Sequence, residues 1–166
     1  ECVIRGDDHI NNTPKQINIY EAMGWSSPKF AHVPMILGSD GSRLSKRHGA
    51  LNLLSYRDKG LLPHALLNYI VRLGWSHGDQ EIFSVDEMIN LFDLRNINNS
   101  PASFNQEKLE WINQSHIKTT DVSELASSLK WHLNQLNIEI DNGPNINEVI
   151  YALRDRSKSL VDMAQS

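Results

Sequence analysis

Helix start and stop signals follow one another so closely after residue 50 that they restrict this part of the chain to short helices. Pro63 opens a segment in which apolar residues recur at helical spacing, and Gly74 stands near its end. Ser84 and Glu87 have the spacing of a capping box. The expected helices begin at about residues 52, 63, 84, 106, 121 and 145. The helix that begins at 106 is expected to end at about residue 114, and the last helix runs to the C-terminus. The buried stripe expected for the second helix consists of Leu66, Leu67, Ile70, Val71 and Leu73.

The first 50 residues have a different pattern, in which short apolar segments alternate with turns. Residues 3–4 have the composition of the end of a buried strand, and residues 14–23 form an expected helix that Asn12 caps. Residues 31–37 are expected to form another strand, which Pro34 restricts to the edge or the end of a sheet. The expected fold class is therefore mainly α, with a small α/β piece at the N-terminus.

The composition excludes several classes of protein. The 166 residues carry 16 basic and 20 acidic side chains, and a net charge of −4 argues against a general nucleic-acid coat, although not against a local basic patch. No apolar run approaches about 18 residues, so no membrane-spanning helix is expected. Cys2 is the one cysteine, which excludes an internal disulfide and a cysteine-rich zinc site, so we expect no structural metal. The chain begins without Met inside an apolar run, and we expect it to be a piece of a longer protein.

A basic loop is the first candidate for chemistry. Arg43, Lys46 and Arg47 place three cations within five residues, beside His48. An ammonium group such as that of Lys46 stabilises charge that develops on a polyphosphate as a bond breaks. The alternative is a solvated basic turn, which is a common feature of protein surfaces.

The polar residues that follow the first strand are the second candidate. Ligands of α/β sheets bind outside the carboxyl ends of strands, and Arg5, Asp8 and His9 lie at such an end. The guanidinium of Arg5 suits a carboxylate, and Asp8 is able to accept hydrogen bonds from ribose hydroxyls. The alternative is a turn that ends the strand and contains an internal Arg–Asp pair.

The aromatic residues of the helical part are expected to serve the core. Trp75, Trp111 and Trp131 lie on or beside apolar helical stripes, which favours packing over stacking on nucleic-acid bases. Four histidines have no partner motif and are expected at the surface or, with their hydrogen bonds made, in the core: His64, His77, His116 and His132.

Several segments resemble, in order and in spacing, those of one enzyme family. Residues 3–16 are similar to the segment after a late catalytic-domain strand of bacterial glutamyl-tRNA synthetases. Residues 31–36 and 43–50 resemble that family's version of the KMSKS loop of class I synthetases, and residues 62–69 and 73–79 are similar as well. The resemblance covers essentially the whole chain.

The resemblance implies catalytic roles for the basic loop. Lys46 matches the second lysine of the motif, which contacts the ATP phosphates and stabilises the departing pyrophosphate. Arg43 stands where the motif often has its first lysine, and Arg47 stands where many class I enzymes have Ser. Leu44 replaces Met beside the substrate, and Ser45 completes the pentad.

The resemblance also implies binding roles for residues outside the loop. Arg5 matches the arginine that holds the side-chain carboxylate of glutamate, and Asp8 matches an acidic residue near the ATP ribose, usually a longer Glu. His9 matches a position beside the amino-acid and ATP pocket. Met35 and Ile36 match the segment whose backbone lies against adenine.

By this resemblance, the parent enzyme ligates L-glutamate to tRNA(Glu) through a glutamyl-adenylate, with ATP and Mg²⁺, as a cytoplasmic monomer. Residues 1–50 are expected to be the C-terminal part of the Rossmann-like catalytic domain, with its KMSKS-like loop. Residues 51–115 are expected to form a helical stem-contact domain, and residues 116–166 the start of a helical anticodon-binding domain. Candidates for contact with tRNA phosphates, or simply for solvated surface, are Arg57, Lys59, Arg72 and Lys108.

Other parts of such an enzyme are not found in the sequence. The HIGH motif, the first half of the nucleotide-binding fold and the acceptor-binding insertion with its occasional zinc cluster are missing, so we expect the chain alone to be inactive. Two other functions stay open: a paralogous glutamyl-queuosine synthetase acting on tRNA(Asp), and a non-catalytic helical module that binds tRNA. The contacts that decide whether tRNA(Gln) is charged too are expected beyond residue 166.

Overall fold

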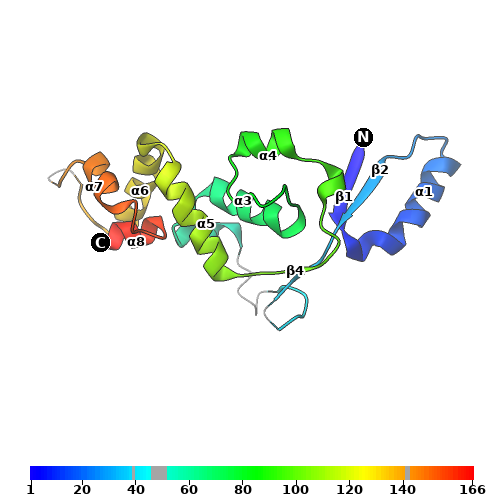
Figure 1. Ribbon diagram of the computed structural model, residues 1–166, viewed down its shortest axis with the longest axis horizontal. Coiled ribbons are helices and arrows are strands. Elements are labelled where there is room, and N and C mark those ends of the chain that lie inside the picture. The colour runs from blue at the N-terminus through cyan, green and yellow to red at the C-terminus, as the bar shows by residue number, and fades with distance from the viewer. Residues whose placement is uncertain (39, 46–51, 141–142) are drawn as a thin grey trace.

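The computed structural model describes residues 1–38, 40–45, 52–140 and 143–166. The molecule is elongated, with a small α/β part at one end and helices over the rest of its length (Figure 1). This arrangement confirms the expected fold class. None of the described helices has the length and apolar character needed to cross a membrane.

Two parallel strands and one helix make up the α/β part. Strand β1 (Cys2–Gly6) is followed by the 3-10 helix η1 (Asp7–Asn12), helix α1 (Thr13–Ala22) and strand β2 (Lys29–Val33). Strands β1 and β2 pair in parallel, with Arg5 opposite His32. The expectation of a buried first strand is wrong for this chain, because Ile4 is 46% exposed. Asn12 holds the N-cap position of α1 as expected, but its side chain makes no capping hydrogen bond.

A second, smaller parallel pair connects the α/β part to the helices. Strand β3 (Ile36–Leu37) pairs with strand β4 (Ala102–Ser103), which lies far along the sequence. The expected strand over 31–37 is therefore two strands, β2 and β3, separated at Pro34 and Met35. Proline has no N–H group to donate to a neighbouring strand, which explains why the pairing stops there.

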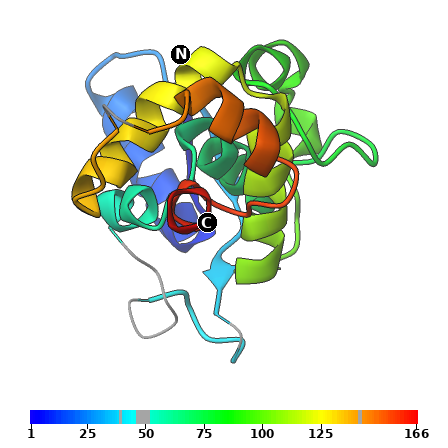
Figure 2. The ribbon, with the colours of Figure 1, turned by 90° about the vertical axis from the view of Figure 1, so that its left-hand side faces the viewer.

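Helices form the remainder of the described chain. Their bounds are α2 (Leu53–Asp58), α3 (Pro63–Gly74), α4 (Val85–Leu91), the 3-10 helix η3 (Leu94–Asn96), α5 (Gln106–Thr119), α6 (Val122–Gln135), α7 (Ile146–Leu153) and α8 (Leu160–Gln165). Seen from the C-terminal end, α8 lies at the centre of the view, with α5, α6 and α7 around it (Figure 2). The main core lies between these helices and α3, and its most buried members include Leu62, Leu109, Ile112, Leu125, Leu129, Ile150 and Leu160.

The capping signals after residue 50 are confirmed. Ser84 and Glu87 make both hydrogen bonds of the capping box at the start of α4. Asn52, Asp121 and Asn145 accept backbone hydrogen bonds at the starts of α2, α6 and α7. Such caps satisfy N–H groups that have no partner inside the helix, which is why these side chains mark helix starts in the sequence.

Two helix ends differ from the expectation. Helix α5 continues to Thr119 instead of ending near residue 114. The last helix is interrupted between Leu153 and Leu160, where Ser159 caps a new helix, α8. At this break the guanidinium of Arg154 donates to the carbonyls of Ile117 and Thr120 at the end of α5. Tertiary hydrogen bonds of this kind leave no periodic signal in the sequence.

The buried faces are also less apolar than expected. On α3, Leu67 and Ile70 are about half exposed, whereas Asn68 and Tyr69 are buried. Trp75 packs in a small core with Phe83 and Met88 as expected. Trp111 is 48% exposed, so its assignment to the core is wrong.

Candidate functional site

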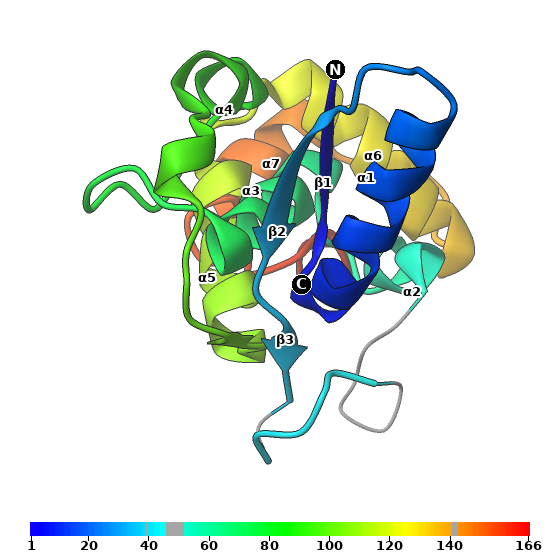
Figure 3. The ribbon, with the colours of Figure 1, turned by 90° about the vertical axis from the view of Figure 1, so that its right-hand side faces the viewer.

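The polar residues after β1 and the segment after β2 lie at the same edge of the sheet. Because the two strands are parallel, their carboxyl ends meet there. Figure 3 shows β1 and β2 side by side next to α1, with β3 continuing away from the carboxyl end of β2. The candidate site therefore lies where η1 and the segment around β3 leave the sheet.

The first part of the basic loop is held as a hairpin whose two sides are Ile36–Leu37 and Arg43–Leu44. The amide of Leu44 donates to the carbonyl of Ile36 over 2.9 Å, and that of Gly38 donates to the carbonyl of Ser42 over 2.8 Å. On its other side, the carbonyl of Leu37 accepts a 2.8 Å hydrogen bond from the amide of Phe104, just after β4. The helical part thus supports the root of the loop directly.

One ion pair brings the two candidate groups together. An Nη2 atom of Arg43 lies 3.1 Å from a carboxylate oxygen of Asp8, across 35 positions of sequence. The Arg43 side chain is 68% exposed, so this pair contributes little to stability. The pair is informative about position, because it shows that the basic loop begins beside the end of β1. The hypothesis of an Arg–Asp pair inside the turn is wrong, since Asp8 pairs with the loop instead.

Arg5 has a different set of partners. Its Nη2 donates to the hydroxyl of Thr13 over 2.8 Å, and its Nε points at Nε2 of His32 over 3.4 Å. The guanidinium carbon lies 5.0 Å from the centre of the Phe30 ring. These partners come from α1 and β2. Sequence reasoning missed them, although the alternation along β2 places Phe30 and His32 on one face.

The other predicted site residues include His9 on η1 and residues in or beside the hairpin. His9 is exposed, and its Nδ1 lies 3.4 Å from the side-chain nitrogen of Asn12. Leu44 in the hairpin is half-buried, as are Met35 and Ser45 on either side of it. The predicted roles of Lys46 and Arg47 fall outside the described residues.

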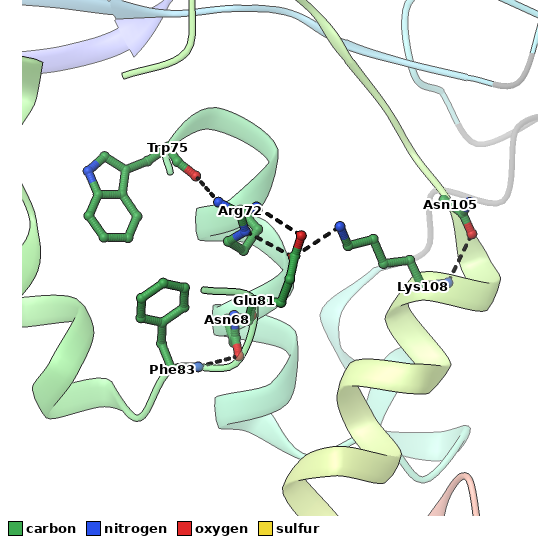
Figure 4. A network of polar contacts seen from close by, with 7 residues as sticks. All are labelled: Asn68, Arg72, Trp75, Glu81, Phe83, Asn105 and Lys108. Atoms are coloured by element: carbon green, nitrogen blue, oxygen red, sulfur yellow. Dashed lines mark hydrogen bonds and ion pairs between the residues drawn. The ribbon is translucent and has the colours of Figure 1, made fainter. Parts of the chain in front are cut away.

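Glu81 links α3 to α5 (Figure 4). Its two carboxylate oxygens lie 3.0 Å and 3.1 Å from nitrogens of Arg72, and one of them lies 3.0 Å from Nζ of Lys108. The hydrogen bond from Arg72, supported by Lys108, lowers the pKa of Glu81. Two candidates for phosphate contact, Arg72 and Lys108, are therefore ion-paired within the protein. A third, Arg57, lies 4.3 Å over the ring of Trp131.

Buried polar groups fix the junctions between the helices. The hydroxyl of Tyr69 accepts a 2.7 Å hydrogen bond from the amide of Asn105, just before α5, and burial raises the pKa of Tyr69. The oxygen of Asn68 lies 2.9 Å from the amide of Phe83 and from Nε2 of His116. That oxygen only accepts, so His116 carries its proton on Nε2. The expectation of a core histidine with its hydrogen bonds made is thus confirmed for His116.

Burial, assisted by the neighbouring His64, lowers the pKa of His116 to about 4. His116 therefore stays neutral at physiological pH and serves the fold. No group of three or more His, Cys, Asp or Glu side chains in the described segments is arranged to hold a metal ion. The candidate site contains the guanidinium of Arg5 and the Asp8–Arg43 ion pair.

Two known proteins with similar sequences are named glutamate--tRNA ligases. Glutamate--tRNA ligase of Ruthia magnifica subsp. Calyptogena magnifica is 63% identical over 164 residues, which is 99% of this chain and 36% of the relative. Glutamate--tRNA ligase 1 of Nitrosococcus oceani is 58% identical over 99% of this chain and 35% of its own length. The chain thus spans about a third of the relatives it matches.

Solved structures agree with the sequences. A glutamate tRNA ligase from Elizabethkingia meningosepticum, in complex with its amino acid, matches 99% of this chain and 36% of its own with a TM-score of 0.82 and 32% identity. The glutamate-tRNA synthetase of Elizabethkingia anophelis matches equally well, with a TM-score of 0.82. The family model for class I tRNA synthetases (E and Q), catalytic domain, matches residues 2–111. This match extends over more than half of the chain and confirms the resemblance seen in the sequence, so the chain belongs to the class I tRNA synthetases of the E and Q type.

Proposed function

We propose that this chain is part of an enzyme that ligates L-glutamate to tRNA(Glu) through a glutamyl-adenylate. The observation that carries the proposal is the Asp8–Arg43 pair at 3.1 Å, which joins the strand end that bears Arg5 to the start of the KMSKS-like loop. Formation of a glutamyl-adenylate requires a group that holds glutamate next to a loop that holds the phosphates of ATP. The names of the relatives agree with this reaction.

In the proposed first step, the α-carboxylate of glutamate attacks the α-phosphorus of ATP and pyrophosphate leaves. Arg5 holds the side-chain carboxylate of glutamate, and Lys46 stabilises the negative charge on the leaving pyrophosphate. Arg43, Ser45 and Arg47 complete the loop around the phosphates. Mg²⁺ enters with ATP as part of the substrate.

The remaining binding residues are assigned to the nucleotide and to the pocket beside it. We assign Asp8 to the ATP ribose, His9 to the wall between the amino acid and ATP, and the segment from Met35 to Ile36, with Leu44, to the adenine. Because Asp8 pairs with Arg43 in the structure, ribose binding at Asp8 requires that this exposed pair open or be shared. The low cost of opening an exposed pair is compatible with this role.

We further assign residues 1–50 to the end of the catalytic domain, 51–115 to a stem-contact domain and 116–166 to the start of an anticodon-binding domain. The contact from Phe104 to Leu37 then connects the stem-contact part to the root of the catalytic loop. The packed helices α6, α7 and α8 favour a tRNA(Glu) enzyme over a glutamyl-queuosine synthetase without an anticodon domain.

The test is glutamate charging of tRNA(Glu) by this chain, alone and mixed with the N-terminal part of the enzyme. We expect activity only in the mixture. Lys46→Ala should lower the rate about 10²-fold, the loss typical of one charge-stabilising donor. The matched control is Lys130→Ala, which removes an exposed lysine on α6 and should change the rate less than threefold.

Each outcome of this test has a definite meaning. Activity of the chain alone would contradict the assignment to half of a site. A Lys46→Ala loss no larger than that of the control would remove Lys46 from the chemistry. No charging by the mixture, with both parts folded, would favour a tRNA-binding module without catalysis.

A further inference from the structure

The guanidinium of Arg5 is held on three sides by neutral groups. Thr13 on α1 accepts from Nη2 at 2.8 Å, His32 on β2 lies 3.4 Å from Nε, and the Phe30 ring lies 5.0 Å from the guanidinium carbon. We propose that Thr13, His32 and Phe30 are positioning residues that aim Arg5 at the side-chain carboxylate of the amino-acid substrate. The inference rests on the proposed function, and it adds these residues to the determinants of glutamate affinity.

The first argument is the charge of Arg5. Among the described residues, no carboxylate forms an ion pair with Arg5, and Asp8, one of the two acids at the same strand end, pairs with Arg43. Arginine stays charged at any physiological pH, and a half-buried cation without a counter-ion is costly. An anionic ligand would supply the missing charge.

The second argument is the number of donors that remain. A guanidinium has five N–H donors in one plane, and the contacts with His32 and Thr13 use one on Nε and one on Nη2. The part of the chain that the structure describes contains no partner for Nη1. The second donor of Nη2 and a donor of Nη1 lie side by side, which is the arrangement that binds a carboxylate with two parallel hydrogen bonds.

The third argument is the restriction that the partners impose on one another. The guanidinium only donates, so Nε2 of His32 accepts and the proton of the neutral ring lies on Nδ1. The Thr13 hydroxyl lies 3.2 Å from the same Nε2 and 3.4 Å from the carbonyl of His9. Arg5 and His32 also face each other in the strand register. A cation fixed this way loses less conformational entropy when a ligand binds.

The experiment measures charging kinetics in the whole enzyme for Thr13→Val, which keeps the shape and removes the hydroxyl. We expect KM for glutamate to rise about five- to tenfold, as for the loss of one typical hydrogen bond. KM for ATP and kcat should change less than twofold. Thr13→Ser keeps the hydroxyl and should restore KM for glutamate. Thr119→Val, at an exposed threonine of α5, is the matched control.

A second pair of variants tests His32 by the same measurement. His32→Phe keeps a ring without an acceptor and should raise KM for glutamate, whereas His32→Gln offers an oxygen near the position of Nε2 and should raise it less. Equal changes in KM for glutamate and for ATP would overturn the proposal, because they would indicate a general disturbance of the fold.

Arg5→Lys separates this proposal from the function on which it rests. If Arg5→Lys raises KM for glutamate at least tenfold while Thr13→Val and His32→Phe leave it unchanged, Arg5 binds substrate but is not positioned by these residues. If Arg5→Lys also has no effect, the carboxylate is bound elsewhere and both the assignment of Arg5 and the positioning role are wrong. If the unmodified enzyme charges no glutamate, the proposed function itself fails.

Discussion

Gly60 is the position where a single methyl group should be most damaging. It follows α2 with a φ of +79°, and a Cβ atom there would lie 2.4 Å from the amide nitrogen of Val161 and 2.7 Å from that of Leu160. The carbonyl of Gly60 also accepts a 2.9 Å hydrogen bond from the amide of Leu160. Helix α8 therefore docks directly on this glycine, and Gly60→Ala should displace it.

The expected loss can be built from three contributions. A left-handed conformation costs a non-glycine residue about 1 kcal/mol. Loss of the hydrogen bond from Leu160 costs about another 1 kcal/mol. Leu160 and Met163 are each 2% exposed, and partial withdrawal of both from the core adds about 1 to 2 kcal/mol. We expect Gly60→Ala to lower the free energy of unfolding by about 3 to 4 kcal/mol.

Gly78→Ala provides the matched control. Gly78 has a φ of +53°, but a Cβ atom there has nothing within 4 Å. This variant carries the conformational cost alone, about 1 kcal/mol. Urea unfolding of the 166-residue chain, followed by circular dichroism, gives the free energy for each variant. If Gly60→Ala costs no more than Gly78→Ala, the close approach of α8 does not exist in solution.

Three further predictions concern buried polar groups. Asn113→Leu removes the partner of the Leu62 amide at 2.8 Å and of the Lys158 carbonyl at 2.7 Å, and should cost about 2 to 4 kcal/mol in urea unfolding. Tyr69→Phe leaves the Asn105 amide without its 2.7 Å acceptor, and should cost about 1 to 2 kcal/mol in the same assay. The pKa of His116 is about 4 in the folded chain and 6.5 as its ordinary value, so the unfolded chain binds more protons between these values. Stability should therefore fall as pH drops from 6.5 towards 4, by at most about 3 kcal/mol, and His116→Gln should flatten that slope in unfolding measured across the pH range.

The ion pairs around Glu81 weaken the case for tRNA contact by Arg72 and Lys108. Arg72 and Lys108 both lie against this carboxylate, so neither is an independent cation on the surface. A basic residue in a sequence is therefore a weak guide to phosphate binding until its partners are known. In the structure, Arg72 on α3 and Lys108 on α5 are joined through Glu81, which holds α3 against α5.

The sequence alone determined the local elements and the family. Helix starts are readable because a capping side chain and the N–H groups it satisfies lie within three residues of each other, as at Ser84 and Glu87. The order and the amino-acid sequences of the motifs around Arg5 and Lys46 were enough to identify the resemblance to class I synthetases. The family model confirms this resemblance.

Tertiary structure decided what depends on contacts between distant segments. Three examples are the pairing of β3 with β4, the ion pair of Asp8 with Arg43 and the hydrogen bonds around Arg5. Each joins residues that are separated in the sequence, and no sequence pattern predicts that they meet. The same is true of Arg154, which follows α7 and donates to the carbonyl of Thr120 at the end of α5. A periodic pattern reports which face of a segment is apolar, but the partner of that face is set by how the whole chain packs.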